Sequence, residues 1–198
     1  MRKILSAIIF LVFYTTIYSQ PKQIPDSVQI KTTILNFYNW YNKNLKRLDG
    51  FKLYNGIKVK DSPPYKINWK EAERYFSFIK INVPQLGEEF INNERKFFRQ
   101  CDSAFKAEPE DEIPYGFDYD RFTNSQEEPQ WFVEELKKAK QWAITIAGTT
   151  ATVDILGSYL DNGKELETVI MCLAMKKEKS KWKIIKIGCA FETLQENQ

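Results

Sequence analysis

The stretch QWAITIAGTTATVDILGSY, from Gln141 to Tyr159, decides the fold because apolar residues occupy every second position in two short runs. The alternating apolar residues are Trp142, Ile144, Ile146, Ala151, Val153 and Ile155. A period of two is typical of a β-strand that buries one face, and Gly148-Thr149 between the runs can form a turn. The stretch therefore predicts a β-hairpin.

The strand pattern continues towards the C-terminus. Asp161-Asn162-Gly163 is a second turn signal before ELETVIMCLAMKKE, and KEKSK (177–181) is a third before WKIIKIGCAF. Asn-Gly pairs favour tight turns between neighbouring antiparallel strands. We therefore expect a four-stranded antiparallel meander at the C-terminal end.

Upstream of these strands, apolar residues recur every three or four positions, which is the spacing of an amphipathic helix. The three predicted helices run from Asp26 or Ser27 to Asp49-Gly50, from the N-cap Asn68 through Ile79, and from Pro84 to just before Pro109. Between the first two helices, Asn55-Gly56 in FKLYNGIKVKD predicts a β-hairpin turn.

Helices that precede strands, rather than alternate with them, favour an α+β fold. We expect N-terminal helices packed on a curved C-terminal four-stranded antiparallel sheet. No internal repeat or low-complexity run occurs in the chain, so we expect a single domain.

The first nineteen residues, MRKILSAIIFLVFYTTIYS, have the pattern of a secretory signal peptide. Arg2 and Lys3 precede an apolar run from Ile4 to Phe13, which is shorter than the stretch of about 20 residues that spans a bilayer. The expected organisation is a signal peptide at 1–19, a flexible leader at 20–26, a single α+β domain at 27–191 and a C-terminal tail at 192–198. We expect a periplasmic or secreted protein with no membrane attachment after signal removal.

The mature chain is nearly neutral. Of 29 basic side chains, Arg2 and Lys3 lie in the signal peptide, which leaves 27 against 26 acidic side chains. Binding of nucleic acid requires a strongly basic surface, so nucleic acid is not an expected partner.

The chain contains no histidine. Ser-His-Asp catalysis, Cys-His catalysis and His-ligated metal sites are therefore excluded within this chain. No GxSxG, GxxxxGKS or GxGxxG motif occurs either, which leaves the nucleophile-elbow, P-loop and dinucleotide-binding classes without support. We expect no cofactor and no metal.

Three cysteines, Cys101, Cys172 and Cys189, would lie in a compartment where disulfides persist. Their odd number permits one internal bridge at most. A hairpin that turns near Lys179-Ser180 places Cys172 opposite about position 187, which argues against a cross-strand bridge to Cys189. Buried free thiols and a single bridge both stay open.

The stretch GFDYDRFTNSQEEPQWF, from Gly116 to Phe132, gathers acids, amides and aromatic residues just before the strands. Asp118 and Asp120 are spaced like the first ligands of a calcium loop. The positions that then need an oxygen ligand, a glycine and a bidentate Glu hold Phe122, Thr123 and Pro129. A calcium loop is therefore not expected.

A pair of carboxylates can divide acid and base roles, with Asp118 or Asp120 as a general base beside Tyr115 or Tyr119. The better interpretation is structural: the two Asp form Asx-turns, and Glu127, Glu128 and Pro129 begin a short helix. Asp118 and Asp120 are therefore weak catalytic candidates within a connector.

Five aromatic side chains are candidate ligand-binding residues: Tyr38, Trp40 and Tyr41 on the first helix, and Tyr115 and Tyr119 before the strands. A helix that crosses a curved sheet can leave a cavity where such rings stack on a ligand. Core packing is the competing and commoner function of these rings. We expect Tyr38 and Tyr41 to face the sheet and Trp40 to lie at its margin.

Three segments, FYNWY (37–41), GFDYDRFTNSQ (116–126) and KWKIIKI (181–187), resemble the secreted bacterial domain-of-unknown-function family 3828 over about Val28 to Phe191. That family is similar to the nuclear transport factor 2-like, or cystatin-like, α+β superfamily. The resemblance implies a cone-like fold with a pocket between the helices and a bent sheet. The resemblance implies no catalytic residue, because no activity is established for the family. Enzymes of the superfamily generally rely on an Asp, Tyr or His that lines the pocket, and of these residue types this chain has only Asp and Tyr.

We expect a secreted or periplasmic binding domain, without catalysis, that engages a small ligand or a protein partner through its pocket or sheet face. One alternative is an isomerase- or hydrolase-like enzyme that uses Asp118 or Asp120. Another, suggested by related small domains that look like immunity proteins, is an inhibitor whose acidic loop at 108–112 meets a basic partner.

Overall fold

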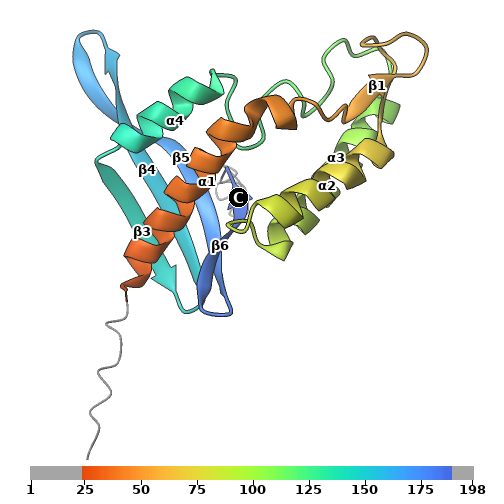
Figure 1. Ribbon diagram of the computed structural model, residues 1–198. Helices are drawn as coiled ribbons and strands as arrows, with labels where there is room; N and C mark the ends of the chain where they lie inside the picture. The colour runs from red at the N-terminus through yellow and green to blue at the C-terminus, as the bar shows by residue number, and fades with distance from the viewer. Residues whose placement is uncertain (1–23, 189–198) are drawn as a thin grey trace, which may run out of the picture.

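The structure is a computed structural model that describes residues 24–188. The expected signal peptide at 1–19 and tail at 192–198 lie outside these residues, and the last residue of the expected leader belongs to the first helix. The elements are α1 (Asp26–Leu48), β1 (Tyr54–Gly56), β2 (Tyr65–Ile67), α2 (Trp69–Asn82), α3 (Glu88–Ala107), α4 (Pro129–Lys138), β3 (Gln141–Ala147), β4 (Thr150–Asp161), β5 (Lys164–Glu178) and β6 (Lys181–Ile187). The predicted α+β class is therefore confirmed (Figure 1).

The C-terminal sheet has the predicted antiparallel meander, with strand order β3-β4-β5-β6. Its turns lie where the sequence places them, at Gly148, at Asn162-Gly163 and at Lys179-Ser180, and all five residues have positive φ. Two-residue hairpin turns need such values because their twist then matches the twist of the strands. The sheet is curved in part and does not close into a barrel.

Two β-bulges, which the sequence pattern does not reveal, shift the register of β5 against its neighbours. The bulge between Ala174 and Met175 makes Leu173 pair with Ile187, and the N–H of Gly188 donates to the Cys172 carbonyl at 2.9 Å. The expected register, with Cys172 opposite position 187, is therefore wrong by one residue.

The cysteines differ in state. Cys172 is disulfide-bonded, whereas Cys101 is a buried free thiol. The free-thiol alternative is thus confirmed for Cys101 and wrong for Cys172. Cys189, to which the expectation on pairing also refers, lies outside the described residues.

α1 packs along the inner face of the sheet, and α4 lies beside α1 (Figure 1). The buried side chains of α1 are Ile30, Ile34, Phe37, Tyr38 and Tyr41, at helical spacing. The sheet meets them with Ala151, Val153, Ile155, Met171, Leu173, Met175, Trp182 and Ile184. Burial of this many large apolar side chains is the main stabilising contribution to the fold.

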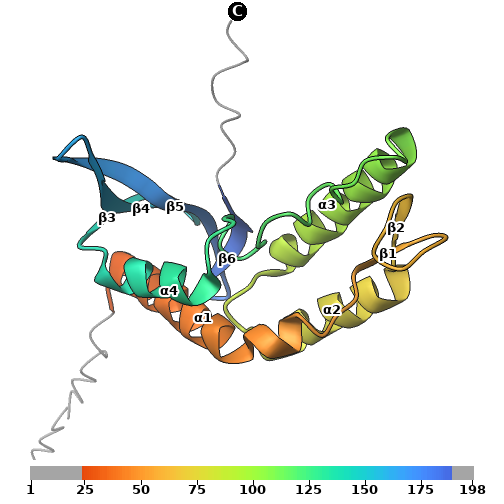
Figure 2. The same ribbon diagram turned by 90° about the horizontal axis from the view of Figure 1, so that it is seen from above.

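α2 and α3 form an antiparallel pair that extends beyond β6 and carries the β1–β2 hairpin at its far end (Figure 2). Before α3, the N–H of Gly87 donates to Ile184 and the N–H of Ile184 donates to Gln85, both at 2.9 Å. Because these residues pair with β6, α3 begins only at Glu88, and the expected helix start at Pro84 is wrong.

The β1–β2 hairpin exists, but Asn55-Gly56 is not its turn. Both residues belong to β1, and the connection runs from Ile57 to Pro64. A Cβ at Gly56 would overlap the carbonyl oxygens of Val59 and Ser62, so glycine is needed for close approach rather than for a tight turn. The N-cap of α2 is as predicted, since the Asn68 side chain accepts from Glu71 N–H.

Candidate ligand-binding site

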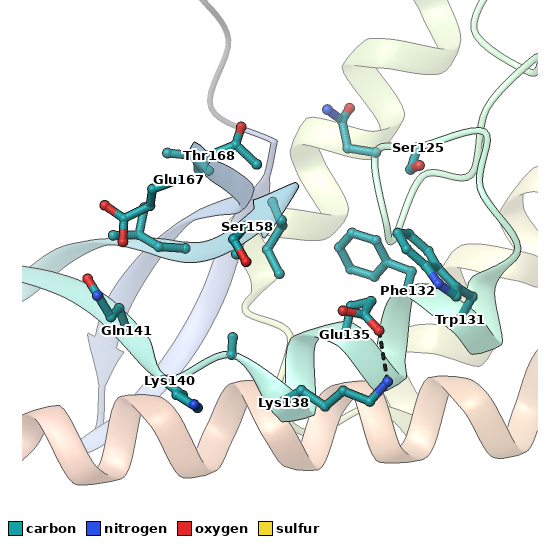
Figure 3. A pocket seen from close by; sticks show the side chains of 16 residues that line it. Ser125, Trp131, Phe132, Glu135, Lys138, Lys140, Gln141, Ser158, Glu167 and Thr168 are labelled. Carbon is teal, nitrogen blue, oxygen red and sulfur yellow. Dashed lines mark hydrogen bonds and ion pairs between the residues drawn. The ribbon is translucent and has the colours of Figure 1, made fainter. Parts of the chain in front are cut away.

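A cleft of about 790 Å³ lies between α4 and the β4–β5 hairpin (Figure 3). Small-molecule sites have volumes of roughly 300–1,000 Å³, so the cleft is large enough for such a ligand. The helix wall presents Trp131, Phe132, Glu135 and Lys138, and the strand wall presents Leu156, Ser158, Thr168, Val169 and Ile170.

The start of α4 sets the helix wall. Pro129 occupies the first turn, where its missing N–H costs nothing, and the helix begins where the sequence predicts. Phe132 is buried, with its ring 6.1 Å from that of Tyr38 on α1. Trp131, one position earlier, lies off this buried face and is 53% exposed at the cleft.

The strand wall begins at the second bulge, between Ile155 and Leu156, where β4 and β5 shift register and bend. Beside this bulge, a Cβ at Gly157 would lie 2.7 Å from Ile170 Cγ2. Any larger residue at position 157 would therefore displace the Ile170 side chain from the wall. Val169 is 51% exposed, which leaves apolar surface open to the cleft on the side opposite Trp131.

Polar groups surround the apolar surface. Lys138 Nζ forms an ion pair with Glu135 at 2.9 Å, and this hydrogen bond raises the pKa of Lys138 (Figure 3). The charged residues of the cleft are two lysines, Lys138 and Lys140, and two glutamates, Glu135 and Glu167. Their formal charges cancel, so the lining does not select strongly for an anion or a cation.

Asp120 fixes the loop that leads into the cleft. Its Oδ1 accepts hydrogen bonds from the N–H groups of Phe122 and Thr123, both at 2.8 Å, and from Thr123 Oγ1 at 3.1 Å. Its Oδ2 accepts from Tyr41 OH at 2.6 Å. Burial raises the pKa of Tyr41, and the charge of Asp120 acts in the same direction, so the phenol keeps its proton and donates. The predicted Asx-turn is confirmed at Asp120.

The other candidate residues lie apart from the cleft. Asp118 and Tyr115 are exposed, and Tyr119 OH accepts from Arg121 Nη1 at 3.0 Å. Tyr38 is buried and donates to the Phe122 carbonyl at 2.8 Å. Trp40 is partly buried, at the margin as expected. The structure thus gathers Tyr38, Tyr41 and Asp120 around loop backbone, and none of the seven candidates lines the cleft.

A buried ion pair between Glu94 of α3 and Arg121 was not predicted. Arg121 Nη2 lies 2.6 Å from Glu94 Oε1, and the guanidinium stacks 3.7 Å from the Phe97 ring centroid. Burial raises the pKa of Glu94, although Arg121 acts in the opposite direction. The sequence did contain a signal for a buried acid, because Glu94 falls on the apolar stripe of α3 between Phe90 and Phe98.

The described part of the chain holds no group of three or more Cys, Asp or Glu placed to bind a metal ion. Between residues 24 and 188, no helix has the length and apolar character needed to cross a membrane. No protein-family model, curated protein or solved structure matches the chain.

Proposed function

We propose that the chain is a binding domain that takes a small, uncharged amphiphilic ligand in the cleft between α4 and the β4–β5 hairpin. The observation that supports this most is the pair of exposed apolar side chains, Trp131 and Val169, on opposite walls of a cleft of about 790 Å³. Apolar groups left open to water within a concave surface are typical of ligand sites.

The chemical class of the ligand follows from the lining. An apolar part of the ligand would contact Trp131, Val169 and Ile170. The hydroxyl group of Thr168 and the amide of Gln141 can exchange hydrogen bonds with a polar part (Figure 3). Because the charged residues of the cleft balance, a neutral polar group such as a hydroxyl, amide or sugar fits better than a phosphate or an amine.

The two alternative functions have less support. Asp118 is exposed, and the carboxylate of Asp120 already accepts four hydrogen bonds, so neither is poised beside a cavity as a general base would be. The acidic loop at 108–112 is exposed, which suits an inhibitor that meets a basic partner but equally suits a solvated loop.

The test uses residues 20–198 and the neutral, solvent-sensitive dye Nile red as a probe. We expect saturable binding with a blue shift of dye emission, because the dye leaves water for an apolar site. Val169→Arg and Trp131→Ala should each weaken binding at least about tenfold, since each removes apolar contact worth about 1.4 kcal/mol or more. The matched control is Ile113→Arg, which changes an exposed apolar side chain outside the cleft. Equal binding by all four proteins would overturn the proposal.

A further inference from the structure

The two edges of the C-terminal sheet differ in protection. At the β6 edge, residues 85–87 pair with Ile184, and Asn93 Nδ2 donates to the Ile185 carbonyl at 3.1 Å. At the other edge, β3 pairs only with β4, and no backbone hydrogen bond reaches it from any other segment between residues 24 and 188. Alternate N–H and C=O groups of β3 therefore face outward without a strand partner.

β3 also lacks the features that keep edge strands from pairing. Its sequence, QWAITIA, contains no charged residue and no proline, and its register with β4 is continuous over all seven residues. Proteins usually protect an edge with lysine, proline, a bulge or a covering segment. The β6 strand shows three of these protections: a covering segment, the bulge against β5, and three lysines at 181, 183 and 186. Because the β6 edge is protected and the opposite β3 edge is not, β3 is the strand available for pairing.

We propose that two copies of the chain associate through antiparallel pairing of their β3 strands, centred on Ile144, so that the sheet continues from one copy into the other. A two-fold axis at Ile144 places that residue opposite itself, Trp142 opposite Ile146, and Ala143 opposite Thr145 of the second copy. Apolar side chains then meet on the inner face, where Ile146 is 41% exposed in one copy. On the outer face the small side chains of Ala143 and Thr145 meet.

The sequence of β3 favours a second copy over another occupant. In this register every pair across the axis is uncharged, and Trp142, Ile144 and Ile146 meet only apolar side chains of the second copy, so the strand is complementary to itself. No like charges are brought together, because Lys140 falls opposite Gly148 of the second copy. An extended peptide from another protein could pair with the same edge, and the experiment below distinguishes that outcome from pairing of two copies.

The experiment measures the mass of residues 20–198 by sedimentation equilibrium from about 1 µM to about 500 µM, because pairing through a short strand buries little area and gives moderate affinity. We expect a monomer–dimer equilibrium. The variant Ala143→Lys/Thr145→Lys puts lysine opposite lysine twice in the proposed register and should raise the dissociation constant about tenfold or more. Both positions are exposed in one copy, so the fold should tolerate the change.

The matched control is Ala143→Lys/Thr145→Glu, which puts lysine opposite glutamate twice and should retain the dimer. Hydrogen exchange of wild-type residues 141–147 adds a readout without substitutions, and exchange should slow as the protein concentration rises. The proposal is contradicted if the wild type stays monomeric up to the highest concentration, which is the result expected of an edge that captures peptides of other proteins. So does a dimer that the two double variants form equally well, or one in which 141–147 gain no protection.

Discussion

Asp120 determines the path of the chain between α3 and α4, because one carboxylate accepts hydrogen bonds from two backbone N–H groups and two hydroxyls. The hydroxyl of Tyr41 connects this loop to α1. Ser125, five residues further on, lines the cleft, so the same carboxylate helps to place one end of the site. Its function is structural, as the sequence pattern of an Asx-turn indicates.

Replacing Asp120 should therefore destabilise the fold. Asp120→Ala should lower the free energy of unfolding by about 2–4 kcal/mol, and Tyr41→Phe, which removes one hydrogen bond, by about 1 kcal/mol. The control Asp118→Ala changes an exposed side chain and should stay within about 0.5 kcal/mol of wild type. Urea denaturation gives all three values. Similar losses for Asp118→Ala and Asp120→Ala would contradict this account.

The thiol of Cys101 should be inert in the folded protein. Burial raises its pKa to about 12, so almost no thiolate is present at pH 8. We expect alkylation by iodoacetamide to be at least about 100-fold slower in buffer than in urea, without reductant in either. Mass spectrometry of the peptide that contains Cys101 gives the rates, and comparable rates would show that the thiol is accessible.

Residue patterns predict burial better than they predict pairing. The apolar stripe of α1 identified Tyr38 and Tyr41 as core residues, and both are buried. The stripe of α3 contained Glu94, but sequence spacing could not show that Arg121, 27 residues away, would reach it. Contacts between distant residues depend on how helices pack, and no local pattern records that.

At the scale of elements, the four strands of the meander follow from their period of two and their turns. The two bulges could not be predicted, because one extra residue in a strand disturbs the alternation of apolar residues too little to be recognised. The prediction of a turn at Asn55-Gly56 was wrong for a related reason. The pair has the composition of a turn, but the pairing of Tyr54 with Ile67 across the strands places Asn55 and Gly56 inside β1.

Gly56→Ala and Asn55→Ala should differ in their effect on the stability of the β1–β2 hairpin. A Cβ at Gly56 would strike backbone oxygens of Val59 and Ser62, so this change should cost about 2 kcal/mol or more. Asn55 lies in a strand with ordinary φ, so Asn55→Ala should change stability by less than about 1 kcal/mol. Thermal or urea unfolding distinguishes the two, whereas equal costs would favour a tight turn at both residues.

α1 is tied to β5 by an ion pair that should depend on pH. Lys177 Nζ lies 2.7 Å from Asp26 Oδ1, and this hydrogen bond lowers the pKa of Asp26. The stabilisation is present above the ordinary pKa of 3.8 and is lost as pH falls through the lower folded value. Asp26→Asn should therefore lower the Tm at pH 7 but not at about pH 2.

The control for this pair is Asp61→Asn, which alters a loosely paired, exposed carboxylate whose nearest lysine nitrogen, that of Lys60, lies 3.8 Å away. Its Tm should match that of wild type at both pH values, because exposed pairs contribute little. A Tm decrease for Asp26→Asn that is the same at both pH values would mean that charge is not the cause.

At the scale of the whole molecule, the division of the helices creates the site. α1 and α4 cover the sheet, whereas α2 and α3 extend away from it, so α4 is the one helix within residues 24–188 that the outer half of the β4–β5 hairpin faces (Figures 1 and 2). The sequence predicted α4 and both strands, but not the space between them. That space depends on the bulge at Ile155/Leu156 and on where α4 lies against α1, and neither leaves a local signal.

The most direct test of the proposed function is a ¹H–¹⁵N NMR titration of residues 20–198 with octyl glucoside, a neutral amphiphile, kept below its micelle concentration. We expect saturable shifts of backbone amides confined to 124–141 and 156–170, the segments that line the cleft. Shifts gathered instead at 28–36 and 181–183, around the separate cleft beside Trp182, would contradict it, as would shifts that never saturate.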